Sequence, residues 1–497
     1  MNVKSKGILQ EYEPKVVLQY FEEICNIPHG SRNTERLSKE IVSLAEEQGL
    51  KNTRDHRGNI IVWKPATAGY EDQATIILQG HMDMVAVKTN NCPLDLAVDP
   101  LDVQVDGDNI YAKGTSLGGD DGIAVAYMLA VMTDDSIQHP PLELVFTTDE
   151  EIGLAGISEM DVSALQGRKL MNLDTEEEGV MIAGCAGGVK TVCHIPTEET
   201  WGQGKCFKIT VNGLQGGHSG TEIHKERGNA NLILARVLYQ LNKSCGIQLM
   251  EMEGGEKDNA IPYQAQAVVA STAKPEELQE QLAELEMELK GELFGKDDGI
   301  ILNLTLVEDC DQEQSGARSG AEGFKVLTDE SFHKVCMCLL MNPNGVQAMS
   351  STIAGTVETS LNCGIMKLDK DGFLARYALR SSVKSSKNYL KERITEYIRL
   401  LGGTVSYEGD YPPWEYRADS PFRDQVMNIY ENMYQKPMDV QVIHAGLECG
   451  YLSEQLAGLD CVSIGPDMKN IHTTDETLSI ASVGRVWEFL LAVLRER

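Results

Sequence analysis

Histidine and acidic residues stand at five points of the sequence where an apolar stretch ends or a helix begins. These points are Gln79-Gly80-His81-Met82-Asp83, Leu117-Gly118-Gly119-Asp120-Asp121-Gly122, Asp149-Glu150-Glu151, Asp174 and His472. His, Asp and Glu without Cys form the ligand set of a hydrolytic dinuclear zinc, cobalt or manganese site rather than of a structural zinc. The residue types therefore predict a metal-dependent hydrolase.

The charges of these residues agree with two metal ions. Asp120, Glu151 and Asp174 supply −3, two divalent ions supply +4, and a bridging hydroxide supplies −1, so the site is neutral. His81 and Asp83 are two positions apart, and in an extended chain they point to the same side. The Asp83 carboxylate is therefore expected to accept the second ring N–H of His81 and to fix its tautomer.

Each of these segments, taken singly, has an ordinary interpretation. His-x-Asp is then a surface turn, Glu150-Glu151 a pair of solvated charges, and Asp120-Asp121 part of a glycine-rich turn. Their occurrence together is what favours a site.

Strands are expected directly before most of the candidate residues, namely 74–78, 142–147, 169–173 and 461–464. In open α/β sheets, ligands bind beyond the carboxyl ends of the strands, so these strands would bring the candidates to one rim. A helix is expected at 122–134. The order of helices and strands predicts an α/β domain with helices packed on a sheet.

The pattern changes near residue 195, where several short strands and a long Glu-rich helix predict an α+β domain with an antiparallel sheet. The last part of the chain resembles the first again. We therefore expect one domain formed by 1–195 and 406–497 and interrupted by an inserted domain at 196–405.

The composition excludes several other functions. The 497 residues contain 44 Lys and Arg against 75 Asp and Glu, a net charge of −31. Such a chain is repelled by nucleic acids and by anionic membranes, and neither is expected as a partner. The 12 Cys are spread without a disulfide framework, and no apolar run is long enough to span a membrane. These features predict a cytoplasmic protein.

Several segments resemble a known family, and the resemblance runs from about residue 12 to the C-terminus. The segments are "LQGHMDMVAVK", "GTSLGGDDGIAVAYMLA", "FTTDEEIGLAGI", "LMNLDTEEEG", "GLQGGHSGTEIHKERGNAN" and "IHAGLECG". They are similar to the aminoacyl-histidine dipeptidases, which are Xaa-His dipeptidases that include carnosinase-type enzymes. These belong to the dinuclear-zinc family of carboxypeptidase G and peptidase T. The resemblance implies an α/β zinc-peptidase catalytic domain, with a mixed sheet flanked by helices, interrupted by an inserted α+β lid.

The resemblance also implies a role for each candidate in the catalytic domain. His81, Asp120 and Asp174 would hold one metal, and Asp120, Glu151 and His472 the other. Glu150 would be the general base, Asp83 would orient His81, and the Asp120–Asp121 peptide would be cis.

In the inserted domain, the resemblance implies that His218 stabilises the oxyanion, in some relatives from a partner subunit. Asn362 and Arg380 match positions where relatives bind the substrate backbone or carboxylate, although a surface or core role is an equal alternative. One departure concerns Ile471-His472-Thr473-Thr474-Asp475-Glu476, which lacks the prolines that commonly flank the last ligand in the family.

The implied function is hydrolysis of Xaa-His dipeptides such as β-Ala-His. A hydroxide bridging two zinc ions, or cobalt or manganese ions, would attack the peptide, and Glu150 would act as the base. The expected partners are a short peptide with a free C-terminus and a second copy of the chain, bound through the lid. Two alternatives remain open: a broader aminopeptidase, tripeptidase or amidohydrolase of the same family, and a non-catalytic metal- or peptide-binding protein.

Overall fold

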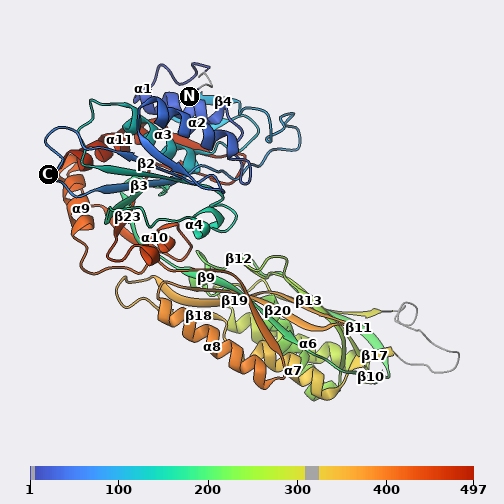
Figure 1. The fold of residues 1–497 in the computed structure, drawn as a ribbon. Helices are drawn as coiled ribbons and strands as arrows, with labels where there is room; N and C mark the ends of the chain where they lie inside the picture. The colour runs from blue at the N-terminus through green and yellow to red at the C-terminus, as the bar shows by residue number, and fades with distance from the viewer. Residues whose placement is uncertain (2–5, 308–323, 497) are drawn as a thin grey trace. The chain divides into compact units, whose positions relative to one another are not determined.

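The chain forms two compact units, and both of its ends lie in the first of them (Figure 1). The computed structural model describes residues 1, 6–307 and 324–496. The first unit combines Met1–Cys185 with Trp414–Arg497, and the inserted unit is Ala186–Pro413. The sequence predicted an insertion from 196 to 405. The inserted unit is longer than that prediction because β9 (Gly187–Ile195) and β21 (Thr404–Tyr411) pair with each other in its sheet.

The first unit is built on a mixed eight-stranded sheet. β3 pairs in parallel with β6 and β7, and β23 pairs in parallel with β7, whereas β1, β2 and β6 pair antiparallel. The strands in spatial order are β1 (Lys51–Arg54), β2 (Ile60–Lys64), β6 (Leu142–Thr147), β3 (Ile76–His81), β7 (Lys169–Asn172), β23 (Asp460–Ser463), β8 (Val180–Cys185) and β22 (Asp439–Ile443).

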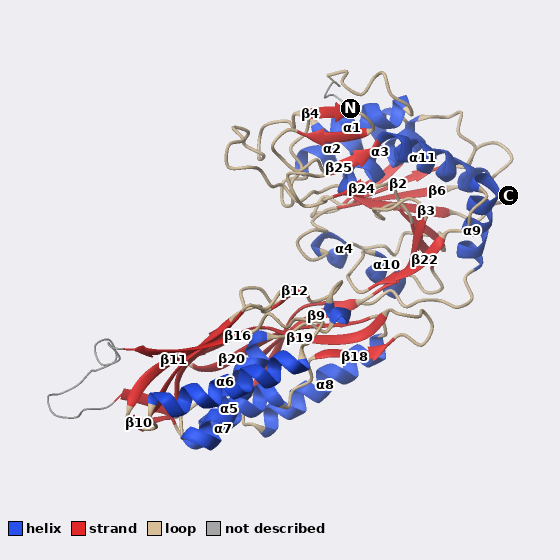
Figure 2. Cartoon of the chain, turned by 180° about the vertical axis from the view of Figure 1, so that it is seen from behind, coloured by secondary structure: helices blue, strands red, loops and turns tan. Residues whose placement is uncertain are grey.

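Helices pack on this sheet (Figure 2), as the sequence predicted. The helices of the first unit are α1 (Lys15–Cys25), α2 (Glu35–Glu47), α3 (Gly119–Thr133), α4 (Ala155–Glu159), α9 (Pro421–Tyr434), α10 (Cys449–Gln455) and α11 (Ile480–Arg495). Of these, α2, α3, α9 and α10 contact strands of the sheet, while α1 packs on α3 and α11 on α9. Helix α3 is buried over almost its whole length, which suits a helix that is apolar on all sides. It contacts β3 and α1 and so lies in the centre of the core.

A small second sheet joins the C-terminal part of the first unit to its N-terminal part. Its strands in order are β24 (Met468–Lys469), β25 (Thr477–Ser479), β5 (Asn109–Ala112) and β4 (Val103–Asp106). β25 pairs antiparallel with β5, so the segment that carries His472 is fixed between β24 and β25.

The inserted unit is an antiparallel nine-stranded sheet with helices on one face (Figure 2), and the predicted α+β architecture is confirmed. The strands are β16 (Ile301–Val307), β11 (Lys205–Asn212), β15 (Ala265–Ser271), β13 (Gln248–Gly254), β19 (Val357–Asp369), β20 (Gly372–Ser381), β9 and β21, with β18 (Gly345–Met349) beside β19. The helices are α5 (Ala230–Cys245), α6 (Pro275–Glu292), α7 (Asp329–Leu340) and α8 (Lys384–Leu400).

Two short ribbons and one turn of helix complete the inserted unit. They are β10 (Glu199–Gly202) with β17 (Phe324–Leu327), β12 (Gly217–His218) with β14 (Ala260–Ile261), and η1 (Ile223–Lys225). Among the described residues of the whole chain, no helix is both long and apolar enough to cross a membrane.

Candidate metal centre

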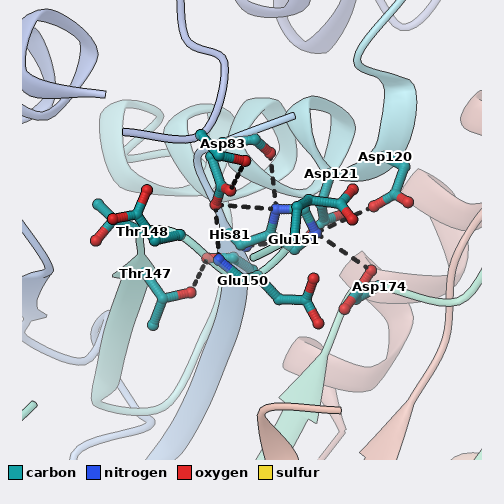
Figure 3. Close-up of polar contacts among 12 residues, drawn as sticks. His81, Asp83, Asp120, Asp121, Thr147, Thr148, Glu150, Glu151 and Asp174 are labelled. Carbon is teal, nitrogen blue, oxygen red and sulfur yellow. Dashed lines mark hydrogen bonds and ion pairs between the residues drawn. The ribbon is translucent and has the colours of Figure 1, made fainter. Parts of the chain in front are cut away.

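The candidate residues of the first unit gather where its central parallel strands end (Figure 3). His81 is the last residue of β3, and Glu150 and Glu151 follow β6. Asp174 lies two residues beyond the end of β7. Because β3, β6 and β7 run parallel, their carboxyl ends meet at the same edge of the sheet.

Asp120 lies between two imidazole rings, with one carboxylate oxygen facing each ring. Its Oδ1 is 3.0 Å from Nε2 of His81, and its Oδ2 is 3.1 Å from Nε2 of His472. Nε2 of His81 is also 3.7 Å from Oδ1 of Asp174, and Nε2 of His472 is 2.8 Å from Oε1 of Glu151. Asp120 therefore has the position expected of a ligand shared by two metal ions.

Among the described residues, three groups of side chains are compact enough to hold a metal ion, with all ligand atoms of a group within 4.8 Å of one another. Asp120, Glu151 and His472 form one group, which is the second predicted ligand set. The other two groups are His81 with Asp121 and Asp174, and His81 with Glu150 and Glu151.

Asp121 lies beside the first predicted ligand set, which joins Asp120 to His81 and Asp174. It forms a compact group with His81 and Asp174, while Nε2 of His81 is 3.0 Å from Asp120 and 3.7 Å from Asp174. Oδ2 of Asp121 accepts the main-chain N–H of His81 at 3.1 Å. The Asp120–Asp121 peptide is cis, as the resemblance implied.

The burial and charge of these carboxylates suit bound cations. Asp121 is fully buried, and the side chains of Glu151 and Asp174 are only 7% and 8% exposed. In the described part of the chain, the ion pairs of Asp120, Glu151 and Asp174 are formed with histidines only. Three buried carboxylates beside two histidines keep an excess of negative charge, which is costly, so the donor set fits two divalent metal ions.

The pKa shifts describe the same electrostatic environment. Hydrogen bonds with Asp120 and Glu151 raise the pKa of His472 to about 10. Burial raises the pKa of Asp174 to about 6. Burial also raises the pKa of Glu150 well above its usual value, and nearby carboxylates, first Asp174, raise it further. A field that stabilises an imidazolium so strongly also favours a bound metal cation.

Asp83 contacts its neighbours differently from the sequence prediction. The main-chain oxygen of Asp83 lies 2.8 Å from Nδ1 of His81, whereas the nearest carboxylate oxygen is 3.7 Å away. The carboxylate instead accepts hydrogen bonds from Ser31 Oγ at 2.8 Å and from the main-chain N–H of Glu150 at 3.0 Å. The chain bends after β3, and this bend brings the carbonyl rather than the carboxylate to the ring.

The profile of Peptidase family M20/M25/M40 matches residues 77–496, which include every candidate of this centre. The chain belongs to peptidase family M20/M25/M40. The predictions of this family, of its fold and of a hydrolase acting on peptide bonds are therefore confirmed.

Relatives of this M20 peptidase agree with the family assignment. The chain is 37% identical over 491 residues to the cytosol non-specific dipeptidase of Escherichia coli (strain K12), covering 98% of this chain and 99% of the relative. The solved aminoacylhistidine dipeptidase from Vibrio alginolyticus is 35% identical with a TM-score of 0.87, covering 98% of this chain and 97% of that one. The aminopeptidase PepT from Bacillus cereus shares the fold, at 14% identity and a TM-score of 0.54, with 97% and 98% covered.

In the inserted unit of this M20 peptidase, His218 is held in one tautomer. The main-chain N–H of Thr221 lies 3.1 Å from Nδ1 of His218, so Nδ1 is an acceptor and a neutral ring carries its proton on Nε2. The main-chain N–H of His218 in turn donates to Oε2 of Glu222 at 2.9 Å. Burial lowers the pKa of His218, and the charge of Arg380 lowers it further.

Asn362 and Arg380 have different surroundings. Asn362 is 1% exposed, and its Nδ2 donates to the main-chain oxygen of Ala260 at 2.8 Å. Ala260 pairs with His218 in the β12–β14 ribbon, so Asn362 supports the strand that carries His218. Arg380 is partly buried and donates from Nη1 to Oη of Tyr411 at 3.1 Å. Its buried Nε has no hydrogen-bond partner among the described residues.

The sequence patterns did not single out two buried glutamates that lie near the candidate metal centre of this M20 peptidase. Glu448 is fully buried, accepts hydrogen bonds from Gln79 and Thr147, and has a pKa raised to about 8 by burial. Glu476 accepts main-chain N–H groups of the loop that leads to Asp120. Two features of the sequence could have pointed to them: Glu476 is four positions after His472, and Glu448 lies in the family-like segment "HAGLECG".

Proposed function

We propose that this M20 peptidase is a cytosolic dipeptidase that hydrolyses Xaa-His dipeptides such as β-Ala-His. The observation that carries the proposal is the position of Asp120, one oxygen 3.0 Å from His81 and the other 3.1 Å from His472. His81 in turn belongs to a compact group with Glu150 and Glu151. The names of two relatives, an aminoacylhistidine dipeptidase and a cytosol non-specific dipeptidase, support the substrate class and the compartment.

Two divalent metal ions are part of this proposal. His81, Asp120 and Asp174 would hold one of them, and Asp120, Glu151 and His472 the other, with Asp121 beside the first. Zinc suits these nitrogen and oxygen ligands, and cobalt or manganese are alternatives. When bound, such ions lower the pKa of water and polarise a carbonyl.

Glu150 would act as the general base and then as the acid. Its carboxylate belongs to a compact group with His81 and Glu151, so it reaches the space that a water and a scissile peptide would occupy. Glu150 would take a proton from the attacking water and pass it to the leaving amine. Asp83 holds the main chain of Glu150 in place through the 3.0 Å hydrogen bond.

The inserted unit would act as a lid that supplies groups to the substrate. His218 would donate its Nε2–H to the oxyanion, because Thr221 occupies Nδ1. Arg380 would bind the free carboxylate of the dipeptide, since its guanidinium has donors left over. Asn362 would support His218 through Ala260. A homodimer formed through this unit is part of the proposal.

A broader dipeptidase is the second candidate, and the name of the Escherichia coli relative favours it. A panel of β-Ala-His, other Xaa-His dipeptides, Ala-Ala, Gly-Leu, a tripeptide and an N-acyl amino acid separates the candidates, with metal content measured on the same protein. We expect the highest kcat/KM for Xaa-His and two metals per chain. Equal rates on all dipeptides favour the second candidate. Two metals with no hydrolysis of any peptide contradict both.

A further inference from the structure

Glu476 is a buried carboxylate whose two oxygens accept main-chain N–H groups from one loop. Its Oε2 lies 2.7 Å from N of Leu117 and 3.1 Å from N of Gly118, and its Oε1 lies 2.8 Å from N of Gly119. A longer contact of 3.4 Å reaches N of Asp120 itself. Glu476 is 3% exposed, so these bonds are shielded from water.

The loop from Leu117 to Asp120 has a shape that fits this carboxylate. Gly118 has a φ of 70°, which other residues adopt only with strain. A Cβ on Gly119 would lie 3.3 Å from Oε1 of Glu476, closer than ordinary contact. Of the three residues whose N–H groups Glu476 accepts, Leu117 and Gly118 precede α3 and Gly119 is its first residue. Asp120 and Asp121 follow with non-helical backbone angles, so Glu476 holds the entry into α3 rather than a regular first turn.

Glu476 also belongs to the segment that carries His472. In this segment Asn470 and His472 have φ values of 53° and 62°, so the chain turns sharply without the prolines of related sequences. Thr473 Oγ1 donates to the main-chain oxygen of Asn470 at 2.7 Å, and Asn470 Nδ2 donates to that of Asp475 at 3.3 Å. Polar contacts therefore hold this segment between β24 and β25.

We propose that Glu476 is a positioning residue that couples Asp120 to His472. The two residues meet through their side chains at 3.1 Å, and the Glu476 carboxylate joins the loop of Asp120 to the segment of His472 a second time. This second connection fixes the separation and orientation of the two ligands before a metal ion binds. The inference rests on the metal centre of the proposed function.

A purely structural link to this loop is the competing role, and metal binding distinguishes the two. A link that serves only folding would lower the melting temperature when removed and would leave the affinity of the centre unchanged. A positioning residue changes the affinity and the geometry of bound metal in protein that is still folded. Partners of metal ligands typically alter the affinity by about 10–100-fold.

The experiment compares Glu476→Gln, Glu476→Asp and the control Asp475→Asn after the metals are removed and Co²⁺ is titrated back. Calorimetry gives the affinities, and the visible absorption of Co²⁺ reports its coordination. In Glu476→Gln the amide nitrogen cannot accept, so we expect about 10–100-fold weaker binding of at least one ion and an altered spectrum. Glu476→Asp keeps the charge with a shorter reach, and we expect an intermediate loss.

The control variant changes a neighbouring carboxylate that has no hydrogen bond to the Asp120 loop among the described residues. Asp475 is exposed and carries the same charge in the same segment, so Asp475→Asn should bind both ions as the wild type does. Wild-type affinities and spectrum in folded Glu476→Gln overturn the inference and leave the proposed function intact. If Glu476→Gln does not fold, the Co²⁺ affinities and spectrum of Glu476→Asp test the inference in its place, and wild-type values there overturn it. A wild-type protein that binds no metal overturns the inference and the proposed function together.

Discussion

Oδ1 of Asp83 accepts the main-chain N–H of Glu150 over 3.0 Å, and this bond connects the segment that follows β3 to the segment that follows β6. The His81 ring is bound by the main-chain oxygen of Asp83 instead, at 2.8 Å. The carboxylate of Asp83 thus positions the proposed base, while its carbonyl positions a proposed ligand. The two roles can be separated by mutation, because only the first requires the side chain.

Asp83→Ala should lower kcat by about 10–100-fold while the bound metal stays at the wild-type level. The substitution leaves the N–H of Glu150 without its acceptor but keeps the carbonyl that binds His81. Asp83→Asn retains an acceptor oxygen and should recover part of the rate. Kinetics and metal analysis on the same preparations check this. Loss of metal from Asp83→Ala would show that the carboxylate supports His81 after all.

Glu150→Gln should lose about 10²–10⁴ in kcat and keep its metal, because an amide cannot take a proton from water. Glu151→Gln is the matched variant one position away. Its side chain lies 2.8 Å from His472, so it should lose metal as well as rate. Turnover and metal content of both variants test the assignment. A fully active Glu150→Gln would remove Glu150 from the role of base.

Chelation should abolish activity and lower the melting temperature, and added zinc, cobalt or manganese should restore both. Metal that binds only the folded state stabilises it by about 2.7 kcal/mol at a hundredfold excess over its Kd. The buried carboxylates Asp120, Glu151 and Asp174 lose their counter-charge when the metal leaves. Thermal denaturation with and without metal measures this effect. Undiminished turnover in protein shown to be metal-free would exclude metal dependence.

His218→Ala should reduce kcat by about 10²–10³-fold without changing metal content, since it removes a donor to the oxyanion. Mixing chains shows whether the donor comes from the same chain or from the other one. A heterodimer of His218→Ala and Glu150→Ala contains one intact site only if His218 acts across the dimer. Recovered activity in the mixture supports action in trans, and an inactive mixture supports action in cis.

Arg380→Ala should raise KM for dipeptides by about 10–100-fold. It should raise KM far less for the corresponding dipeptide amides, which have no free carboxylate. A hydrogen bond to a charged group contributes about 1.5–3 kcal/mol. Tyr411→Phe removes the partner that holds Arg380, so a smaller rise in KM is expected. Tyr407→Phe, on the same strand but bonded to Thr395 and Lys391, is the control and should keep the wild-type KM. Equal effects on acid and amide substrates would exclude a carboxylate contact.

The sequence alone indicated the family and a domain interrupted by an insertion, and it supplied most residues of the candidate metal centre. The largely apolar stretch 142–147 predicted a strand, and β6 has the same bounds in the structure. The polar residues directly after these runs had to meet, because parallel strands end at one edge of a sheet. His81, Glu151 and Asp174 could therefore be found from types and positions that are local in the chain.

The tertiary structure alone decided which atoms of these residues touch. The bend after β3 turned the carbonyl of Asp83 to His81 and its carboxylate to Glu150. Glu476 binds the loop before Asp120, whose residues are 357–359 positions away in the sequence, and no local sequence pattern predicts that contact. Local patterns predict which face or end of an element a residue occupies, whereas hydrogen bonds between distant segments depend on how those elements pack.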